Sequence, residues 1–318
     1  MEVRKVNGFF IIFVIGYIGL SVVCASIMAY AQNSGIAVPD WIQYVMSEGI
    51  ILLIAITYMI VQKIDPIREI PYKRIGIVDV ILSLVAGYCL IPAVLLISNL
   101  SMLFSTNYLE EGTTTLLTYP FAMQVILLAV IPPLVEELIF RGIFFGSYRK
   151  AGMTGAALMS GLLFGCFHLN INQALYAFVM GIVFAYMVEA TGSLWSSVIA
   201  HFAVNTYSIG IVQILKMAGI YAQDGSVSET FENAESVAGQ STAVTVVQIA
   251  MIAVIAAVFM MLAVLCIRTM AKRHGNLEKM KIQKVKLSHI KNYFTAPVIV
   301  GIVVCVMYMI MLEFSGTL

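Results

Sequence analysis

The chain has 318 residues, of which 61% are hydrophobic and only 11% are charged. Soluble domains average roughly 45–50% apolar and about 25% charged residues, so 18 basic and 17 acidic side chains cannot cover this much apolar surface in water. The net charge of +1 also excludes a nucleic-acid binder that works by neutralising phosphates. The composition therefore predicts an all-α fold, a polytopic membrane helix bundle.

Nine apolar segments are long enough to predict membrane helices, because a helix needs about 20 residues to cross a bilayer. The predicted spans are approximately 9–31, 42–62, 77–103, 119–148, 153–169, 171–190, 193–216, 243–267 and 293–314. The fifth and sixth are short and nearly continuous, so they could form a tight hairpin and reduce the count to eight. The first span has no A-x-A cleavage site, so we expect a retained helix and not a signal peptide.

Basic residues indicate the orientation of these spans, because the cytoplasmic loops of membrane proteins are enriched in Lys and Arg. With the N-terminus in the cytoplasm, 16 of the 18 basic residues fall on the cytoplasmic side. The exceptions are Arg141, inside a span, and Lys216, at the end of one. We therefore expect a cytoplasmic N-terminus and an outer C-terminus.

Three regions organise the chain in this interpretation. Residues 1–118 supply N-terminal transmembrane helices, residues 119–216 form the core, and residues 217–318 supply the C-terminal helices. We expect 268–292 to be a basic cytoplasmic loop that contacts anionic lipid head groups. The stretch 217–242, rich in Gly, Ser and Glu, is expected to be a mobile outer loop.

The fourth span carries ionisable residues in the segment PPLVEELIFRG. Such residues are rare and costly inside a membrane, so each is a functional hypothesis. Glu137 and Arg141 are four residues apart, which predicts an ion pair on one helix face. Glu136 is turned about 100° away from that face and is expected to meet a different neighbour.

Two prolines precede these glutamates. Pro132 and Pro133 have no backbone N–H group, so the carbonyls of Leu128 and Ala129 lose their helical partners. This predicts a kinked helix beside a cavity.

Two later spans carry the only membrane histidines. Phe164 precedes His168 by four residues in FGCFH, and His201 precedes Asn205 by four residues in HFAVN. At about 1.5 Å per residue, Glu136 and His168 lie roughly 21–22 Å from the cytoplasmic ends of their helices. His201 lies only about 12 Å from its helix start on the same count, so a tilted helix or an inward-dipping turn at 191–193 is needed to bring it to that depth.

Two imidazoles, a carboxylate and a carboxamide at one depth are the ingredients of a catalytic metal site. Zinc hydrolases commonly use two His and one acid, with an open position for water. Bound metal lowers the pKa of that water towards 7, and a free carboxylate takes its proton. The helical signature H-E-x-x-H is absent, because Leu169 and Phe202 follow the two histidines.

The order EExxxR, FxxxH and HxxxN in successive spans resembles the CPBP family, the CAAX prenyl protease and bacteriocin-processing (Abi) group of intramembrane metalloproteases. The flanking segments EELIFRGIFFGSYRKAG, GLLFGCFHLNINQALYAFVMGIVFAY and TGSLWSSVIAHFAVN resemble the core of that family. The similarity covers about residues 132–208, and the outer helices are not informative.

The resemblance implies a peptidase site within the membrane. Its implied catalytic residues, which are also its expected Zn2+ ligands, are Glu136, His168, His201 and Asn205. The residues that match the rest of the motifs, and are expected to support the site, are Glu137, Arg141 and Phe164. A metal-free mechanism, in which a glutamate and a histidine activate water, stays open beside the metal-assisted one.

We therefore expect hydrolysis of a peptide bond in a hydrophobic or membrane-bound peptide substrate, by a multi-pass protein of a bacterial plasma membrane. Membrane lipid is an expected contact and nucleic acid is not. Two alternatives stay open: a non-catalytic scaffold or immunity protein that keeps the fold, and a secondary transporter, which would also place Glu, His and Arg in the membrane. The sequence does not indicate an oligomeric state.

Overall fold

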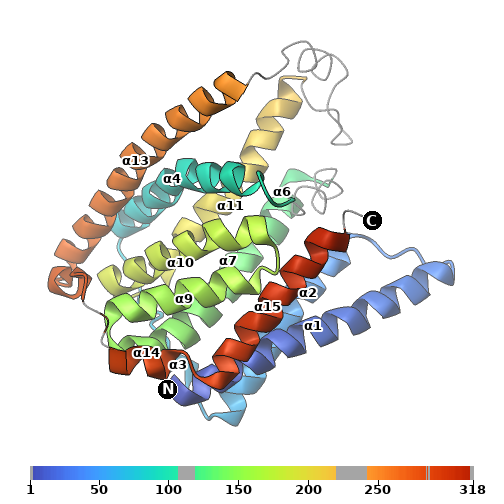
Figure 1. The fold of residues 1–318 in the computed structure, drawn as a ribbon, viewed down its shortest axis with the longest axis horizontal. Coiled ribbons are helices and arrows are strands. Elements are labelled where there is room, and N and C mark those ends of the chain that lie inside the picture. Colours follow the sequence, from blue (N-terminus) through green and yellow to red (C-terminus); the bar gives the residue numbers. More distant parts are fainter. Residues whose placement is uncertain (1–2, 107–118, 220–241, 284, 286, 316–318) are drawn as a thin grey trace.

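The structure is a computed structural model that describes residues 3–106, 119–219, 242–283, 285 and 287–315. Within these ranges every regular element is a helix and none is a strand (Figure 1). This confirms the predicted all-α fold. The predicted outer loop 217–242 lies almost entirely outside the described residues.

Eight helical segments of the described chain are long and apolar enough to cross a membrane. Seven of them lie in α1 (Val3–Asn33), α2 (Trp41–Val61), α4 (Ile77–Ser101), α10 (Ile171–Thr191), α11 (Trp195–Met217), α13 (Thr242–Arg273) and α15 (Ala296–Ser315). The shorter helices are α3 (Pro66–Glu69), α9 (Met153–Phe167), the 3-10 turn η5 (Leu277–Met280) and α14 (Leu287–Tyr293).

The eighth span, Phe121–Ala151, is one rod that changes its helical type along its length. Its elements in order are α6 (Phe121–Gln124), the π-helical η2 (Val125–Val130), α7 (Ile131–Glu137), the π-helical η3 (Leu138–Phe145), α8 (Gly146–Tyr148) and the 3-10 turn η4 (Arg149–Ala151). Wide π turns inside an α-helix are often found at functional sites. Here they flank the short helix that carries Glu136 and Glu137.

Helix α9 is the predicted span that is too short to cross a bilayer. Its 15 residues correspond to about 22 Å, against roughly 30 Å of hydrocarbon. It turns back through residues 168–170 into α10 and packs along it, so the hairpin that the sequence allowed is present (Figure 1).

Two groups of helices enclose the rod Phe121–Ala151. Helices α1, α2 and α15 pack together on one side, and α4, α10, α11 and α13 pack together on the other (Figure 1). From the first group, α2 contacts η2 and α7; from the second, α11 contacts the same two elements. Residues on α7 therefore face partners from both groups.

Stacked aromatic rings join α1 to the rod and to α9. The rings of Phe9 and Phe144 lie 5.4 Å apart, those of Phe13 and Phe167 lie 4.5 Å apart, and Phe140 stacks on Phe144 at 5.7 Å. All five side chains are buried. Such pairs add about 0.5–1.5 kcal/mol each beyond their burial, so this cluster fixes α1 against the core.

Glycines let α9 and α10 approach backbone to backbone. A Cβ atom on Gly165 would lie 2.5 Å from the carbonyl oxygen of Ala174, and one on Gly161 would lie 2.7 Å from that of Phe178. The spacing GLLFG is the small-xxx-small pattern of closely packed membrane helices. This contact sets where the tip of the hairpin, and with it His168, can lie.

The carbonyl of Leu128, which the two prolines leave without a helical partner, accepts a hydrogen bond from another helix. Leu128 cannot be bonded by residue 132 in an α turn or by residue 133 in a π turn, because both are proline. The side-chain amide of Asn205 on α11 donates to this carbonyl at 2.9 Å. The predicted irregularity is present as the π-helical turn η2 and is tied to α11.

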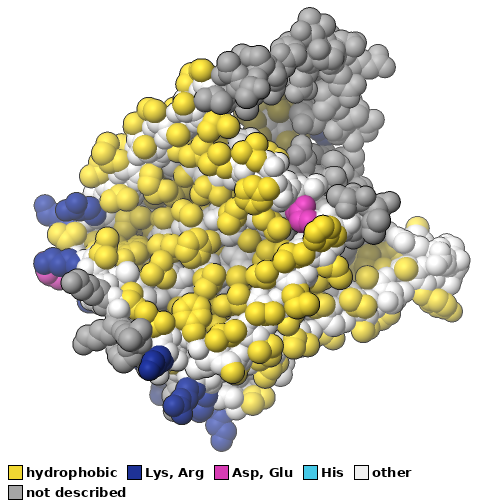
Figure 2. Space-filling model, in the orientation of Figure 1, with side chains coloured by type: hydrophobic (Ala, Val, Ile, Leu, Met, Phe, Trp, Pro, Cys, Tyr) yellow, Lys and Arg dark blue, Asp and Glu magenta, His cyan; other side chains and the backbone are white. Residues whose placement is uncertain are grey.

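Basic side chains gather at one end of the molecule, whereas hydrophobic side chains cover the face between the ends (Figure 2). The described N-terminal helix starts at the basic end, and the chain finishes at the opposite end (Figure 1). This distribution agrees with the predicted orientation. The side of the membrane on which each end lies stays a prediction.

The basic stretch 268–292 is not the continuous loop that we expected. Helix α13 continues to Arg273, because Ile267, Met270 and Ala271 are buried against the core and keep the chain helical. Short helices η5 and α14 occupy part of the remainder.

Asp79, near the start of α4, is paired with residues at the end of α13. Its carboxylate lies 3.2 Å from Nε of Arg273 and 3.0 Å from Nε2 of His274. These contacts fasten the start of α4 to the end of α13.

We predict that Gly165→Ala lowers the stability of the protein by about 1–3 kcal/mol, because the new methyl group meets a backbone carbonyl that cannot move aside. Thermal unfolding of the purified protein in detergent measures the change. Gly210→Ala is the matched control, since a Cβ at Gly210 meets nothing within 4 Å. Equal melting temperatures for the two variants would contradict the close packing of α9 on α10.

The predicted orientation is tested by placing single cysteines at exposed positions near the two ends. A cysteine replacing Ser34, in the turn after α1, should react with an impermeant thiol reagent added to intact cells. A cysteine replacing Glu278, in η5, should react only after the membrane is permeabilised. The unsubstituted protein controls for its own cysteines, and the reverse pattern of labelling would overturn the orientation.

Candidate active site

The site is centred on an ion pair buried in the rod. The guanidinium of Arg141 lies 2.7 Å from Oε1 of Glu137, and neither side chain has any exposed surface. The four-residue spacing predicted this pair, and the structure confirms it. A buried ion pair is stable only when further contacts replace the lost water, so the surroundings of both groups matter.

Two aromatic rings enclose the guanidinium. The central carbon of Arg141 lies 4.2 Å from the ring centre of Phe164 on α9 and 5.1 Å from that of Phe184 on α10. Ring faces attract cations, more strongly where water is excluded. Gly181 leaves room for the guanidinium, because a Cβ there would lie 3.2 Å from Nη2 of Arg141.

His201 on α11 is held by one glutamate and faces the other. Its Nδ1 atom lies 3.0 Å from Oε1 of Glu137, and its Nε2 atom lies 3.7 Å from Oε2 of Glu136. A carboxylate accepts hydrogen bonds, so Nδ1 carries the proton that is donated to Glu137. In the neutral imidazole Nε2 then has a free lone pair directed towards Glu136.

The two glutamates therefore have different neighbours, as the helical period predicted. Glu137 has Arg141 and His201, whereas Glu136 faces Nε2 of His201 across a gap too long for a hydrogen bond. The side chain of Glu136 retains 14% exposure, against none for Glu137. Of the two, Glu136 is the carboxylate with access to a further group.

His168 follows α9 at its C-terminal cap and joins the site through Phe164. Its Nδ1 atom donates to the carbonyl oxygen of Phe164 at 2.8 Å, which leaves Nε2 free. The ring of Phe164 lies 4.7 Å from the ring of His168 and 5.9 Å from that of His201. Phe164 thus separates the two imidazoles and contacts both.

Asn205 lies one helical turn beyond His201, and its side chain forms a hydrogen bond with a backbone carbonyl. One N–H of its amide is used by Leu128, so the second N–H and the side-chain oxygen are the atoms it can offer to another group. Within the described chain, no hydrogen bond or ion pair joins its side chain to those of the other six predicted site residues.

Residue counting placed His201 closer to the cytoplasmic end than Glu136 and His168. The position at which α11 starts accounts for this difference. The turn before α11 is buried, with Ser193 and Leu194 almost fully covered. Ser193 donates to the carbonyl of Lys73, and the N–H of Leu194 donates to Pro71 at 2.8 Å. The chain at 71–73 covers this turn, so α11 begins inside the protein.

Two residues at the site were missed by sequence reasoning. Phe184 lies 5.3 Å from the ring of His201 as well as over Arg141, and nothing in the sequence distinguishes it from other apolar residues of its helix. Glu48 lies on α2, which packs against η2 and α7, and its Oε2 atom is buried. No motif in the sequence links it to the core.

Polar atoms without partners concentrate here. Among the described residues, six buried side-chain nitrogen or oxygen atoms have no hydrogen-bond partner. Four of these belong to the site, namely Oε2 of Glu48, Oε2 of Glu137, and Nε and Nη2 of Arg141. Orphaned buried atoms are rare in folded proteins and commonly mark bound water or a ligand site.

A metal ion fits this donor set only in part. Both histidines have Nδ1 fixed by an acceptor and Nε2 free, which is the usual arrangement of metal-binding histidines. The 3.7 Å between Nε2 of His201 and Oε2 of Glu136 is near the roughly 3.3 Å expected of two ligands at about 2.0–2.1 Å from one zinc. Within the described residues, however, no three His, Cys, Asp or Glu side chains form a metal-binding group. The expected zinc site stays a prediction.

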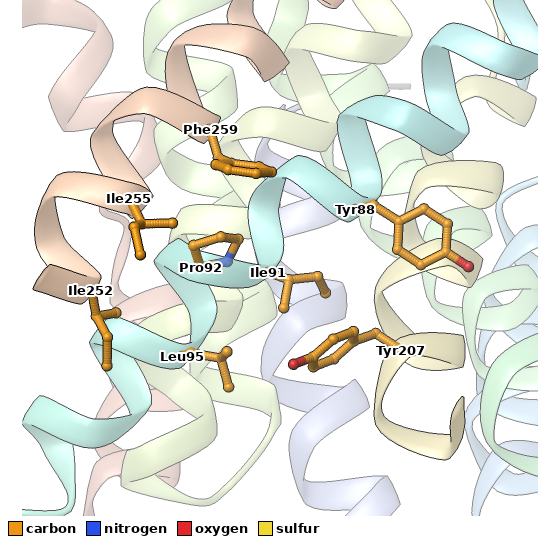
Figure 3. A pocket seen from close by; sticks show the side chains of 8 residues that line it. All are labelled: Tyr88, Ile91, Pro92, Leu95, Tyr207, Ile252, Ile255 and Phe259. Atoms are coloured by element: carbon orange, nitrogen blue, oxygen red, sulfur yellow. The ribbon is translucent and has the colours of Figure 1, made fainter. Parts of the chain in front are cut away.

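A separate apolar pocket of about 360 Å³ lies between α4, α11 and α13 (Figure 3). It is lined by Tyr88, Ile91, Pro92, Leu95, Tyr207, Ile252, Ile255 and Phe259. No carboxylate or imidazole lines it, so it offers no groups for hydrolysis. It is distinct from the site around Glu136.

Comparison with known proteins matches the part of the chain that contains these residues. Residues 118–207 match the family described as type II CAAX prenyl endopeptidase Rce1-like. The Bacillus subtilis (strain 168) protein described as "Putative membrane peptidase YdiL" is 33% identical over 88 residues. That alignment spans 27% of this chain and 36% of the relative, about a third of its length. No solved structure matches the chain.

The matched residues contain α7, η3, α9, α10 and more than half of α11, and with them Glu136, Glu137, Arg141, His168 and His201. The rest of the chain adds further membrane helices around them. The match to the type II CAAX prenyl endopeptidase Rce1-like family therefore covers one segment, residues 118–207, of a multi-pass membrane protein.

Proposed function

We propose that this protein is an intramembrane endopeptidase that cleaves a hydrophobic or membrane-bound peptide at a site formed by Glu136, His168, His201 and Asn205. The observation that carries the proposal is the pairing of Glu136 with Nε2 of His201 across 3.7 Å. Neither atom bonds the other, and both face the same space, so a water molecule can be held between them. A bacterial plasma membrane is the location we propose.

In this proposal Glu136 is the general base. It takes a proton from water as the oxygen attacks the peptide carbonyl, and it later gives that proton to the departing amine nitrogen as the C–N bond breaks. His168, with Nε2 free, assists in orienting the water. The second N–H of Asn205 stabilises the negative oxygen that forms in between, and His201 donates to it from Nε2 when that nitrogen is protonated.

Glu137 and Arg141 position these groups and do not react. Glu137 holds Nδ1 of His201 and so directs its Nε2 towards Glu136. Arg141 neutralises Glu137, and Phe164 and Phe184 hold the guanidinium in place. The ion pair therefore sets the geometry of the base without contacting the substrate.

Zinc, if bound, would be held by Glu136 and Nε2 of His168 and His201, with the oxygen of Asn205 as a further ligand. It would supply Lewis-acid activation of water. The roles given above are those of the metal-free mechanism, in which Glu136 and both Nε2 atoms are free.

The reaction is tested by comparing membrane peptides in cells that produce the wild-type protein or Glu136→Gln. We expect cleavage products that depend on wild-type protein and disappear in Glu136→Gln, because glutamine cannot accept the proton of water. Glu278→Gln, at an exposed surface position, is the matched control and should leave the products unchanged. Identical peptides in all strains would contradict the proposal.

A peptide found in this way then serves as substrate for purified variants. Since groups that act as a unit are not additive, a triple alanine variant of Glu136, His168 and His201 should be scarcely slower than the slowest single variant. Metal content of the same samples decides the role of zinc. Stoichiometric metal that is lost in His168→Ala and His201→Ala would support it, and metal-free, chelator-resistant activity would exclude it.

For the ion pair we predict that Arg141→Ala loses about 3–5 kcal/mol of stability, because it leaves the Glu137 charge buried and unpaired. The measurements are the yield of folded protein and its thermal unfolding in detergent. An Arg141→Ala protein that melts like the wild type but is inactive would show that Arg141 takes part in catalysis, and our division of roles would be wrong.

A further inference from the structure

The turn that carries His168 contains a residue in an unusual backbone conformation. Leu169, directly after His168, has a φ angle of +54°, in the left-handed region that a bulky side chain rarely adopts. Such conformations persist only where the surrounding structure holds them, and they cluster at active sites. The place of Leu169, next to the imidazole proposed to orient the water, therefore calls for an explanation.

The other helix ends of this chain show which residue a left-handed turn ordinarily uses. Glycine is the usual residue there, because it has no Cβ atom. Four of the described helices, α1, α10, α11 and α13, are followed within two residues by a glycine with positive φ, namely Gly35, Gly192, Gly219 and Gly275. Among the described residues, the two with positive φ that are not glycine are Lys63, after α2, and Leu169, after α9. The chain thus has a leucine at the end of α9 where it has glycine at four comparable ends.

The side chain of Leu169 is the feature that a glycine would lack. It is only 9% exposed and belongs to the buried cluster that contains Phe164, Phe167 and Val135. Lys63 is exposed, so its side chain is not held by the core. At Leu169, therefore, an unfavourable backbone angle is accompanied by apolar packing that a glycine could not make.

The backbone on either side of Leu169 fixes the turn in which His168 lies. The N–H of His168 donates to the carbonyl of Gly165 at 3.2 Å, and the N–H of Leu169 donates to that of Cys166 at 3.3 Å. Asn170 then starts α10 as its N-cap. Only these three residues, 168–170, join two packed helices, so a change in the backbone angles of Leu169 moves His168 relative to its neighbours.

We infer that Leu169 is a positioning residue for His168. Its buried side chain anchors the turn in the left-handed conformation, and this conformation directs the imidazole so that Nδ1 bonds the carbonyl of Phe164 and Nε2 stays free. A glycine would permit the same conformation and also many others, because it lacks the side chain that selects one. The effect on the reaction rests on the proposed function, whereas the positioning of the imidazole does not.

The position of His168 is measured without a substrate, by NMR of the purified full-length protein with 15N in its histidines. Spectra are recorded at about pH 8, where histidine is neutral, and the His168 signals are identified by their absence in His168→Gln. In the wild type we expect one tautomer with the proton on Nδ1, because that nitrogen donates to Phe164. In Leu169→Gly we expect a mixture of the two tautomers, since the imidazole is no longer held against that carbonyl.

Three comparisons separate this effect from other causes. Leu169→Met keeps an apolar side chain of similar volume and should retain the wild-type His168 signals. Lys63→Gly makes the same change at the other non-glycine position of positive φ, where the side chain is exposed, and should leave them unchanged. The signals of His201, whose Nδ1 atom donates to Glu137, should stay in place in every variant.

Wild-type His168 signals in Leu169→Gly would overturn the inference. Signals of His168 and His201 that change together would also overturn it, because they would show a general loosening of the fold. If Leu169→Gly does not fold, Leu169→Ala takes its place and is judged in the same way, since it also removes the anchor.

Activity gives a second readout. With the peptide identified above, Leu169→Gly should lower kcat about tenfold to a hundredfold with little change in KM, because a small displacement of a catalytic group slows the reaction more than it weakens binding. Leu169→Met should keep kcat near the wild-type value. An active enzyme in which Leu169→Gly keeps the wild-type kcat refutes the effect on the reaction and leaves the peptidase intact. A wild-type protein with no activity refutes the peptidase, and the NMR signals still decide whether Leu169 positions His168.

Discussion

The burial of the Arg141 guanidinium beside Glu137 is the constraint that the central helices have to satisfy. Neither side chain is exposed, so both ions have lost their hydration. The attraction between them offsets this loss only when further close contacts surround the pair. The rings of Phe164 and Phe184 supply them on one side and His201 on the other. A variant that loosens α9 or α10 therefore weakens the contacts that hold the pair.

The same constraint explains why two adjacent glutamates in one helix behave differently. One is fully used in holding Arg141 and His201. The other lies about 100° around the helix and faces the second nitrogen of the same imidazole. A single histidine, His201, therefore links the buried ion pair to the neighbouring carboxylate of Glu136.

The sequence predicted the parts of this arrangement that depend on spacing along one helix, and it failed where helices meet. Four-residue spacing was enough to pair Glu137 with Arg141 and to place Phe164 on the side of His168. The spacing could not show that the side-chain amide of Asn205 donates to the carbonyl of Leu128. Which donor reaches that carbonyl depends on how α11 packs against the rod. Residue counting also placed His201 too close to the cytoplasmic end, since it assumed that α11 begins at the membrane surface. Asp79 found its partners on α13, far along the chain, by the same kind of contact between helices.

The short helix α9 has a consequence for how the protein enters the membrane. Its 15 residues span about 22 Å, less than the roughly 30 Å of the hydrocarbon layer. The turn that ends it satisfies its own backbone, because the N–H groups of His168 and Leu169 bond the carbonyls of Gly165 and Cys166. Since such a helix is too short to cross the bilayer alone, we expect α9 and α10 to enter the membrane together as one hairpin.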